Sequence, residues 1–154
     1  MVKRVTSICA AAAAAAALWG GTAGAVSGSQ QFNVQRGGRT RTVTASGPIS
    51  GTGVDIVIND QRDRFKFKGG SVLFDHQPHN LTRTFDEKTC TSTLREKGTY
   101  QLSSGTNKFR RAKGNGTYTA TTKDKFKAVP GGGCAGGRPT TTFSLNASGT
   151  TTLP

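Results

Sequence analysis

The chain lacks the short motifs that mark several common enzyme classes. It contains no G-x-S-x-G nucleophile elbow, no P-loop and no glycine fingerprint for a dinucleotide. No serine or cysteine stands beside a recognisable base in the sequence, so the chain offers no obvious activated nucleophile. These absences argue against a hydrolase and against an enzyme that binds nucleotides through either glycine-rich motif.

Helical periodicity is also missing. No stretch keeps an apolar period of 3.6 residues for three turns, and threonine, glycine, serine and β-branched residues dominate. Alternation with a period of two is common instead, as in Arg64-Phe65-Lys66-Phe67-Lys68, and it predicts half-buried strands. The same alternation groups other residues on shared faces: Val54, Ile56 and Ile58; Val72 and Phe74; Leu81, Arg83 and Phe85; Leu94, Glu96, Gly98, Tyr100 and Leu102.

Glycine, proline, asparagine and aspartate interrupt these short alternating runs at close intervals. Examples are Gly37-Gly38, Ser46-Gly47-Pro48, Asn59-Asp60 and Gly69-Gly70. Short strands between dense turns predict an all-β fold with about eight antiparallel strands in a meander, as a barrel or a sandwich. We expect a single domain over residues 26–154.

Tryptophan occurs once, at Trp19, within a segment that resembles a secretory signal. Lys3 and Arg4 precede an apolar run over residues 5–19, and Ala23-Gly24-Ala25 follows. This order predicts a signal peptide of residues 1–25, cleaved before Val26. A retained membrane anchor is the alternative, but crossing a bilayer takes about 20 apolar residues. We therefore expect a secreted protein without a membrane partner after cleavage.

Cysteine is scarce. Outside the predicted signal only Cys90 and Cys134 remain. An even count in an exported chain predicts a disulfide between them, with two free thiols as the alternative. Neither cysteine has a C-x-x-C partner or a nearby histidine, which argues against zinc. The bond would tie the glycine-rich residues 131–137 to the start of the Cys90 strand.

Residues 99–119 carry a resemblance to a known family. A strand enters the turn Gly105-Thr106-Asn107, an aromatic follows at Phe109, and Ala112 and Gly114 precede another strand. This segment resembles the hairpin of the allene-oxide-cyclase and dirigent barrels. It is most similar to that of their small exported bacterial relatives, in which a Phe-Asp-x-x-Thr-Cys run, here residues 85–90, precedes the hairpin.

The resemblance covers about residues 51–153 and implies an eight-stranded antiparallel barrel with a lumen. Plant members of the family steer a cyclisation or a radical coupling in that lumen without metal or organic cofactor. Asn107 replaces the usual glycine, and asparagine also tolerates a left-handed backbone. Lipocalins and biotin-binding barrels are weaker matches because residues 26–154 contain no tryptophan. The catalytic residues of the plant cyclases have no counterpart that can be placed here.

Candidate site residues follow from strand parity. A carboxylate on an apolar face loses solvation and has a raised pKa unless a cation pairs with it. Glu96 is in this position, and we expect Arg83 to be its partner, either in a ligand-polarising site with Tyr100 or in a structural ion pair. A β-bulge that turns Glu96 outward is the alternative. The lumen lining is predicted to be apolar: Phe65, Phe67, Leu94, Tyr100 and Leu102.

Asp75-His76-Gln77-Pro78-His79 contains both histidines. The spacing matches no standard ligand motif, and the proline indicates a turn, so we interpret His76 and His79 as solvated loop residues rather than metal ligands. No metal site and no cofactor are expected.

Acidic residues are few: 8 Asp and Glu stand against 21 Lys and Arg. Two groups of basic residues are candidates for binding an extracellular or cell-wall polyanion. One is a shared strand face, Lys123, Lys125 and Lys127, and the other is the cluster of Lys108, Arg110 and Arg111. Solvated faces that keep a small barrel soluble are the alternative. Specific nucleic-acid binding is not expected.

The leading hypothesis is a secreted barrel that binds an apolar small molecule in its lumen without a cofactor. A cofactor-independent cyclase or isomerase using the same lumen, with Glu96, Arg83 and Tyr100 as candidate catalytic residues, is the second. A cationic protein that binds polyanions, with the barrel as scaffold, is the third.

Overall fold

The computed structural model describes residues 24–154, so nearly all of the predicted signal peptide, residues 1–23, lies outside the described residues. Eight strands follow one another: β1 (Val26–Gly37), β2 (Thr40–Ser46), β3 (Gly51–Asn59), β4 (Arg62–Phe67), β5 (Gly70–Asp86), β6 (Thr91–Gly105), β7 (Lys113–Lys125) and β8 (Thr140–Leu153). A short 3-10 turn, η1 (Asn107–Phe109), separates β6 from β7. No α-helix occurs in the described part, and hence no helix long and apolar enough to cross a membrane.

The strands form a closed antiparallel barrel in chain order, which confirms the predicted fold class. Each strand pairs with the next along the chain, and β1 closes the barrel by pairing with β8 from Val26↔Leu153 to Gln35↔Ser144. The turn after β6 adopts the left-handed conformation expected at Asn107, whose φ is 52°.

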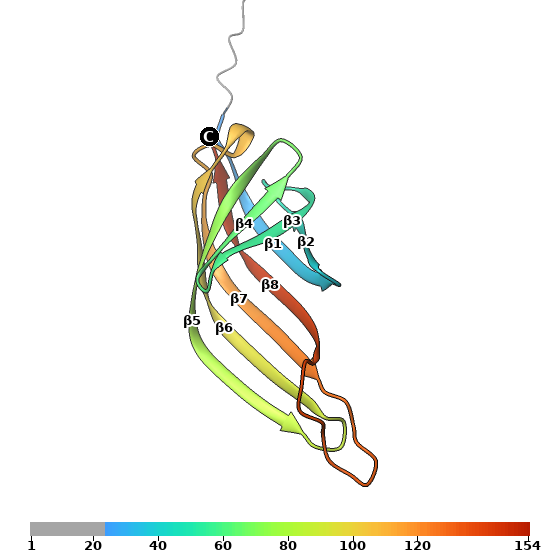
Figure 1. The fold of residues 1–154 in the computed structure, drawn as a ribbon. Helices are drawn as coiled ribbons and strands as arrows, with labels where there is room; N and C mark the ends of the chain where they lie inside the picture. Colours follow the sequence, from blue (N-terminus) through green and yellow to red (C-terminus); the bar gives the residue numbers. More distant parts are fainter. Residues whose placement is uncertain (1–23) are drawn as a thin grey trace, which may run out of the picture.

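The barrel is lopsided because β5 to β8 are longer than β2 to β4 (Figure 1). Strand β4 pairs with β5 only from Arg62↔Asp75 to Phe67↔Gly70. Beyond that point β5 continues to pair with β6, β6 with β7, and β7 with β8. These four strands form a sheet that we call the extension: residues 80–86, 91–97, 119–125 and 140–146. At its barrel end, residues 144–146 of β8 also pair with β1.

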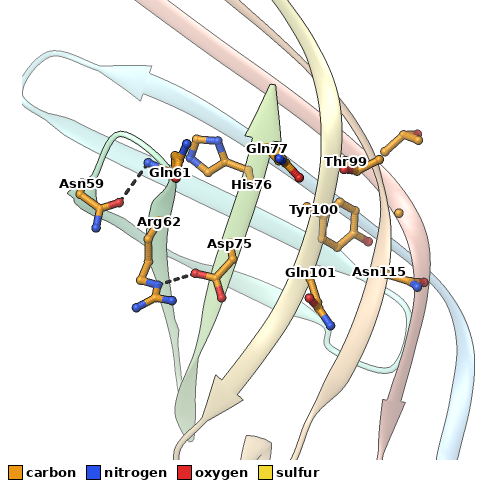
Figure 2. A pocket seen from close by; sticks show the side chains of 12 residues that line it. Asn59, Gln61, Arg62, Asp75, His76, Gln77, Thr99, Tyr100, Gln101 and Asn115 are labelled. Atoms are coloured by element: carbon orange, nitrogen blue, oxygen red, sulfur yellow. Dashed lines mark hydrogen bonds and ion pairs between the residues drawn. The ribbon is translucent and has the colours of Figure 1, made fainter. Parts of the chain in front are cut away.

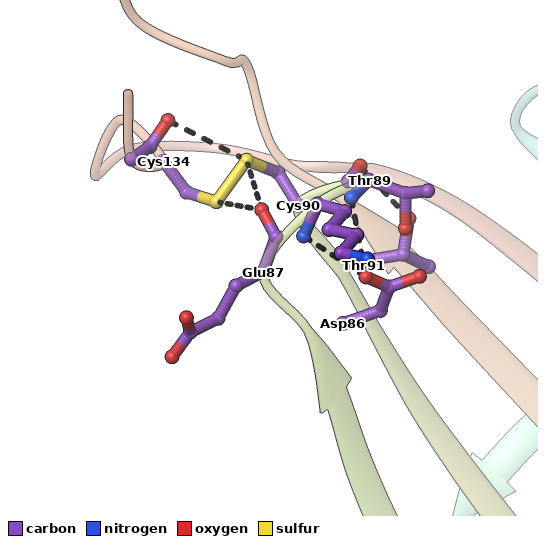
Figure 3. Close-up of a disulfide and its surroundings, with 8 residues drawn as sticks. Asp86, Glu87, Thr89, Cys90, Thr91 and Cys134 are labelled. Atoms are coloured by element: carbon purple, nitrogen blue, oxygen red, sulfur yellow. Dashed lines mark hydrogen bonds between the residues drawn. A yellow bond between two sulfur atoms is a disulfide. The ribbon is translucent and has the colours of Figure 1, made fainter. Parts of the chain in front are cut away.

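A disulfide between Cys90 and Cys134 fastens the tip of the extension, as predicted (Figure 3). The two Cα atoms lie 5.5 Å apart, within the range that a disulfide spans. The bond joins the β5–β6 turn to the glycine-rich loop between β7 and β8. The backbone N–H of Phe126 also donates to the carbonyl of Cys90 at 2.9 Å, so covalent and hydrogen bonds hold the two loops together.

Aromatic rings fill the middle of the barrel. Phe74 stacks on Phe65 with centroids 4.8 Å apart and on Tyr100 at 4.6 Å. Phe32 adds an edge contact to Phe74 at 6.0 Å. These side chains are at most 3% exposed, so the rings bury most of the apolar surface of the core.

Two tyrosines lie across glycines on the neighbouring strand. Tyr118 on β7 pairs with Gly98 on β6, and Tyr100 on β6 pairs with Gly116 on β7. A Cβ atom added at Gly98 would lie 2.7 Å from the Tyr118 ring, and one at Gly116 equally close to the Tyr100 ring. Both glycines are therefore needed to let the rings lie flat against the sheet.

Strand β3 has the opposite orientation to the one its apolar residues suggest. Val54, Ile56 and Ile58 are 41–47% exposed on the outside of the barrel, whereas Asp55 between them is buried. Asp55 pairs with Phe65 of β4, whose ring faces the core, and paired residues share a face. The register of the neighbouring strands thus decides which face of β3 points inward.

Candidate functional site

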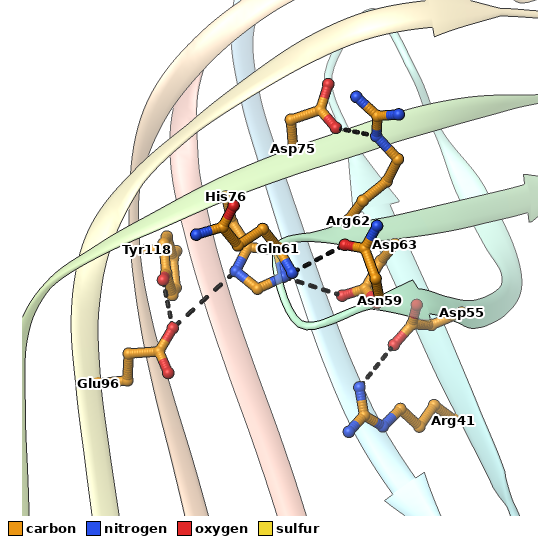
Figure 4. Close-up of polar contacts among 10 residues, drawn as sticks. All are labelled: Arg41, Asp55, Asn59, Gln61, Arg62, Asp63, Asp75, His76, Glu96 and Tyr118. Atoms are coloured by element: carbon orange, nitrogen blue, oxygen red, sulfur yellow. Dashed lines mark hydrogen bonds and ion pairs between the residues drawn. The ribbon is translucent and has the colours of Figure 1, made fainter.

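One end of the barrel, where the extension begins, holds a group of charged and polar side chains. We call it the mouth cluster and define it as Arg41, Asp55, Asp63, His76, Glu96 and Tyr118 (Figure 4). Strands β2, β3, β4, β5, β6 and β7 each supply one of these residues in chain order. Each lies next to a core residue on its own face, either two residues along the strand or directly across on the paired strand. The period of two that packs the core therefore also directs this cluster inward.

His76 stands between two carboxylates. Its Nε2 atom lies 3.7 Å from Oδ2 of Asp63, and its Nδ1 atom lies 3.9 Å from Oε1 of Glu96. Both separations exceed a hydrogen bond. The Nδ1 atom of His76 and the Oδ1 atom of Asp63 are buried without a hydrogen-bond partner. Buried polar atoms are normally paired, so these two are positioned to bind a water or a polar ligand group.

This placement corrects the sequence interpretation of His76 as a solvated loop residue. Residues 75–79 belong to strand β5, and the side chain of His76 is only 12% exposed. The pairing of β5 with β4 stops at Asp75, so this edge of β5 is free at Pro78. Proline lacks an N–H, but no ladder hydrogen bond is lost there and the strand continues. His79 is exposed, as expected, and lies 3.0 Å from the hydroxyl of Thr99.

Glu96 points inward, as its parity predicts, but its partner is not Arg83. The Tyr118 hydroxyl donates a hydrogen bond to Oε1 of Glu96. Arg83 is exposed on the free edge strand β5, where it pairs in register with Leu94 and makes no ion pair among the described residues. A long side chain on an open edge gains more from solvation than from reaching the barrel interior.

Arg41 and Asp55 form the second polar contact of the mouth cluster. Nη1 of Arg41 lies 3.5 Å from Oδ2 of Asp55, and the guanidinium stands 4.0 Å from the centroid of the Phe143 ring. Arg41 therefore offsets the charge of the most buried carboxylate, whose side chain is 1% exposed.

Burial displaces the pKa values in this cluster. Desolvation raises the pKa of Asp63 to about 7, with a further rise from the charge of Asp55 and an opposing effect of Arg41. Burial also raises the pKa of Asp55 against the lowering effect of Arg41. Burial lowers the pKa of His76, although the charges of Glu96 and Asp75 act in the other direction. The two groups that face each other thus shift in opposite directions, because burial favours the neutral form of both Asp63 and His76.

All residues of the mouth cluster except Asp55 line a pocket of about 320 Å³. The polar part of its lining consists of Arg41, Asn59, Asp60, Asp63, His76, Glu96 and Tyr118. The apolar part consists of Val57, Ala120, Phe143 and Leu145. A pocket lined by both kinds of residue fits a ligand with a polar and an apolar part.

The predicted lumen residues lie elsewhere. Phe65, Phe67, Tyr100 and Leu102 are buried in the packed core, none more than 6% exposed. Leu94 is half-buried on the inner face of the extension, where it pairs with Arg83 and Thr122. Tyr100 stacks on Phe74, and its hydroxyl has no hydrogen-bond partner. The parity argument thus places these side chains inward, but the first four pack against other core residues.

A wider pocket of about 990 Å³ lies beside the β3–β4 hairpin (Figure 2). Its charged residues, Arg62 and Asp75, pair with each other. Gln61 donates its backbone N–H to the side chain of Asn59 at 3.0 Å. Apart from His76, which it shares with the mouth cluster, its side chains offer uncharged amides and hydroxyls. It is therefore a weaker candidate for ionic or acid–base chemistry.

The predicted polyanion residues fall into separate groups. Lys108, Arg110 and Arg111 lie in and after η1, in the β6–β7 connection. Lys123 and Lys125 lie on β7 in the extension, and Lys127 follows the end of that strand. The sequence segments therefore do not form one continuous cationic surface.

Sequence reasoning missed Asp63, Asp55, His76, Arg41 and Tyr118. A signal was present for Asp63, which shares parity with Phe65 and Phe67, and for His76, which shares parity with Val72 and Phe74. Asp55 carried a misleading signal, since it stands between two aliphatic residues. Within residues 24–154 no group of three or more His, Cys, Asp or Glu side chains is arranged to hold a metal ion.

Comparison of the chain with family models, with curated proteins and with solved structures gave no match, so the mouth cluster has to be interpreted from its own chemistry.

Proposed function

We propose that the protein is a small-molecule-binding barrel whose site is the mouth cluster. The observation that carries this proposal is the pair of buried, unpartnered atoms, His76 Nδ1 and Asp63 Oδ1, in residues that line a pocket together with apolar side chains. Leaving a buried polar atom unpaired costs about 1–3 kcal/mol, a cost that a ligand can remove. The aromatic packing of the core favours this place over the deeper lumen.

The charges of the cluster favour a cationic head group. Above the pKa of Asp63, near 7, the carboxylates of Asp63 and Glu96 face the pocket while Arg41 is engaged with Asp55. The pocket is then acidic within an otherwise basic protein. An apolar chain extending from the head group would lie against Phe143 and Leu145. The proposed ligand is thus amphipathic, with an amine or another hydrogen-bond donor at its polar end.

A matched pair of probes tests this chemistry. Decylamine and decanoate have the same chain length and opposite head groups, and their binding can be followed by titration calorimetry at about pH 8. We expect decylamine to bind and decanoate to bind at least about tenfold more weakly, the ratio that about 1.4 kcal/mol of charge discrimination gives. Equal affinity for the two probes would contradict the proposed head group.

Variants locate the binding. Glu96→Gln removes one charge from the pocket while it retains an acceptor for Tyr118, and it should weaken decylamine binding several-fold. Glu87→Gln is the matched control, because Glu87 is exposed in the turn at the tip of the extension. An equal effect of the two substitutions would place the binding outside the mouth cluster.

A cofactor-independent isomerase or cyclase is the second candidate, favoured by the pKa values of the cluster. A carboxyl with a pKa near 7 can both give and accept a proton at neutral pH, and His76 lies beside it. Glu96 remains a candidate catalytic residue, whereas Arg83 and Tyr100 are replaced as candidates by Asp63 and His76.

Exchange of carbon-bound hydrogen tests the second candidate without knowledge of the substrate. The α-hydrogens of 2-decanone can be followed by NMR in deuterated buffer with and without the protein. Catalysis predicts faster exchange with the natural protein than with Asp63→Asn. Exchange at the rate of the buffer alone would argue against proton abstraction from a ketone at this site and leave ligand binding as the function.

A further inference from the structure

The pairing of β6, β7 and β8 continues without a register shift from the barrel into the extension. Leu102 pairs with Gly114 at one end and Thr91 with Lys125 at the other, and the β7–β8 ladder is equally regular. Because parity is preserved, residues that alternate with Tyr100 and Tyr118 point outward along the whole sheet. The outer face of the extension can therefore be read residue by residue.

Arg95, Lys97, Lys123 and Lys125 all fall on this outer face. Each of them is exposed, and none makes an ion pair among the described residues. Arg95 and Lys97 are two residues apart on β6, and so are Lys123 and Lys125 on the adjacent strand. Lys123 pairs with Thr93 and Lys125 with Thr91, so the four cations follow one another as a row along the sheet. At about 3.3 Å per residue this row is about 20 Å long.

Acidic residues are nearly excluded from the same face. Glu96 and Asp124 alternate with the cations and so belong to the inner face, where Asp124 accepts a hydrogen bond from Thr141 at 2.6 Å. Asp86, at the end of β5, is in register with the outer face. Its carboxylate accepts the backbone N–H groups of Lys88 and Thr89, so it does not pair with the cations.

The remaining positions of the outer face carry hydroxyls and amides. They are Thr91 and Thr93 on β6, Thr119 and Thr121 on β7, Thr140, Thr142, Ser144 and Asn146 on β8, and Asn80, Thr82 and Thr84 on β5. No aromatic side chain occurs at any of these positions. Bases of single-stranded nucleic acid are held largely by stacking on aromatic side chains, which this face does not offer.

We propose that the outer face of the extension binds an anionic polymer that carries phosphate or sulfate groups beside sugar or polyol hydroxyls. The four cations neutralise the anionic groups, and the threonine-rich surroundings hydrogen-bond to the hydroxyls. The binding surface consists of Arg95 and Lys97 on β6 together with Lys123 and Lys125 on β7. This surface is separate from the Lys108–Arg111 segment and points away from the mouth cluster.

Binding to immobilised poly(glycerol phosphate), to heparin and to single-stranded DNA tests the proposal, with neutral dextran as a blank. We expect both hydroxyl-bearing polyanions to bind more tightly than DNA of equal charge. With about four phosphate contacts, affinity for poly(glycerol phosphate) should fall about 50-fold between about 50 and 200 mM salt, because bound counterions are released. The relative affinity for the first two polymers decides between phosphate and sulfate.

Two charge-matched variants locate the contact. Replacing Arg95, Lys97, Lys123 and Lys125 by glutamine should weaken binding to poly(glycerol phosphate) by more than tenfold at low salt. Replacing Arg64, Lys66, Lys68 and Arg110 removes the same charge elsewhere and should weaken it less than threefold. Thermal melts check that both variants fold, since exposed substitutions usually change stability by less than about 0.5 kcal/mol.

A third variant tests the hydroxyls. Replacing Thr93, Thr121 and Thr142 by valine preserves shape and charge and should weaken binding to poly(glycerol phosphate) about threefold or more. Equal losses in the two charge variants would overturn the proposal in favour of net charge alone. DNA binding as tight as that of the polyol polymer, or no effect of the threonine substitutions, would overturn the assignment to a hydroxyl-bearing partner.

Discussion

The Nε2 atom of His76 lies 3.7 Å from Oδ2 of Asp63, and burial raises the pKa of Asp63 to about 7 while it lowers the pKa of His76. In the folded protein Asp63 is therefore charged only above about pH 7, and only there does the burial of its charge destabilise the fold.

Asp63→Asn should show this cost directly. The folded protein holds the Asp63 proton up to about pH 7, whereas an unfolded aspartate loses it near pH 4. Between these values the folded state binds more protons, so stability falls as pH rises, by at most about 1.4 kcal/mol per pH unit for this group. Chemical denaturation should find the variant similar to the natural protein at about pH 4 and more stable than it at about pH 8. A constant difference at both pH values would show that Asp63 does not titrate in this way.

Tyr118→Phe should destabilise the protein and release Glu96. The hydroxyl of Tyr118 donates to Glu96, and a hydrogen bond to a charged group contributes about 1.5–3 kcal/mol. Tyr100→Phe is the matched control, because the Tyr100 hydroxyl is buried and has no partner. Its removal should cost nothing or stabilise slightly. Thermal melts compare the two variants, and equal destabilisation would argue against the bond to Glu96.

Gly98→Ala should be among the most damaging small substitutions. A Cβ atom there would lie 2.1 Å from the carbonyl oxygen of Gln77 and 2.7 Å from the Tyr118 ring. Either the strand or the tyrosine must move, at a cost of about 2 kcal/mol or more. Gly37→Ala serves as the control, since nothing lies within 4 Å of its added Cβ. Denaturation midpoints measure both, and a tolerated alanine at position 98 would contradict the close approach.

The disulfide and the signal-peptide hypothesis each make a prediction for peptide mapping by mass spectrometry. Under non-reducing conditions a peptide containing Cys90 should be linked to one containing Cys134. Cys90→Ser with Cys134→Ser should lower stability by roughly 4 kcal/mol in the chain-entropy view. The same mapping reads the N-terminus of the protein purified from its source, which the signal-peptide hypothesis places at Val26. Two alkylatable thiols in the native protein would exclude the linkage.

The alternation in the sequence was sufficient to predict antiparallel strands in a barrel or a sandwich, and the family resemblance implied the barrel. Neither located the site. Phe65, Phe67 and Tyr100 repeat with a period of two, and their strands take the predicted orientation. His76 was missed because Pro78 indicates a turn. Only the strand pairing shows that β4 does not reach Pro78, so that the strand can continue through the proline. Asp55 was missed because Val54 and Ile56 suggest that it points to solvent. Its pairing with the buried Phe65 places it on the inner face instead.

The partner of Glu96 could not be predicted for a different reason. Arg83 shares the inner face of the extension with Glu96, as parity indicates, because a register shift between Pro78 and Asn80 brings residue 83 opposite Leu94. Parity gives the face of a residue but not its height along the barrel or its distance from the open edge. Tyr118 is the actual partner because the hairpin register places it across Gly98, next to the strand position of Glu96.

The pairing of β1 with β8 also sets an order of events in time. Strand β1, which begins at Val26, can pair along its second edge only after residues 144–153 of β8 have been synthesised. During synthesis, every intermediate that stops short of β8 leaves the edges of β1 and β7 open, and open edges are where chains pair wrongly with one another. Any chain shortened within β8 should accumulate as aggregates rather than as a smaller barrel.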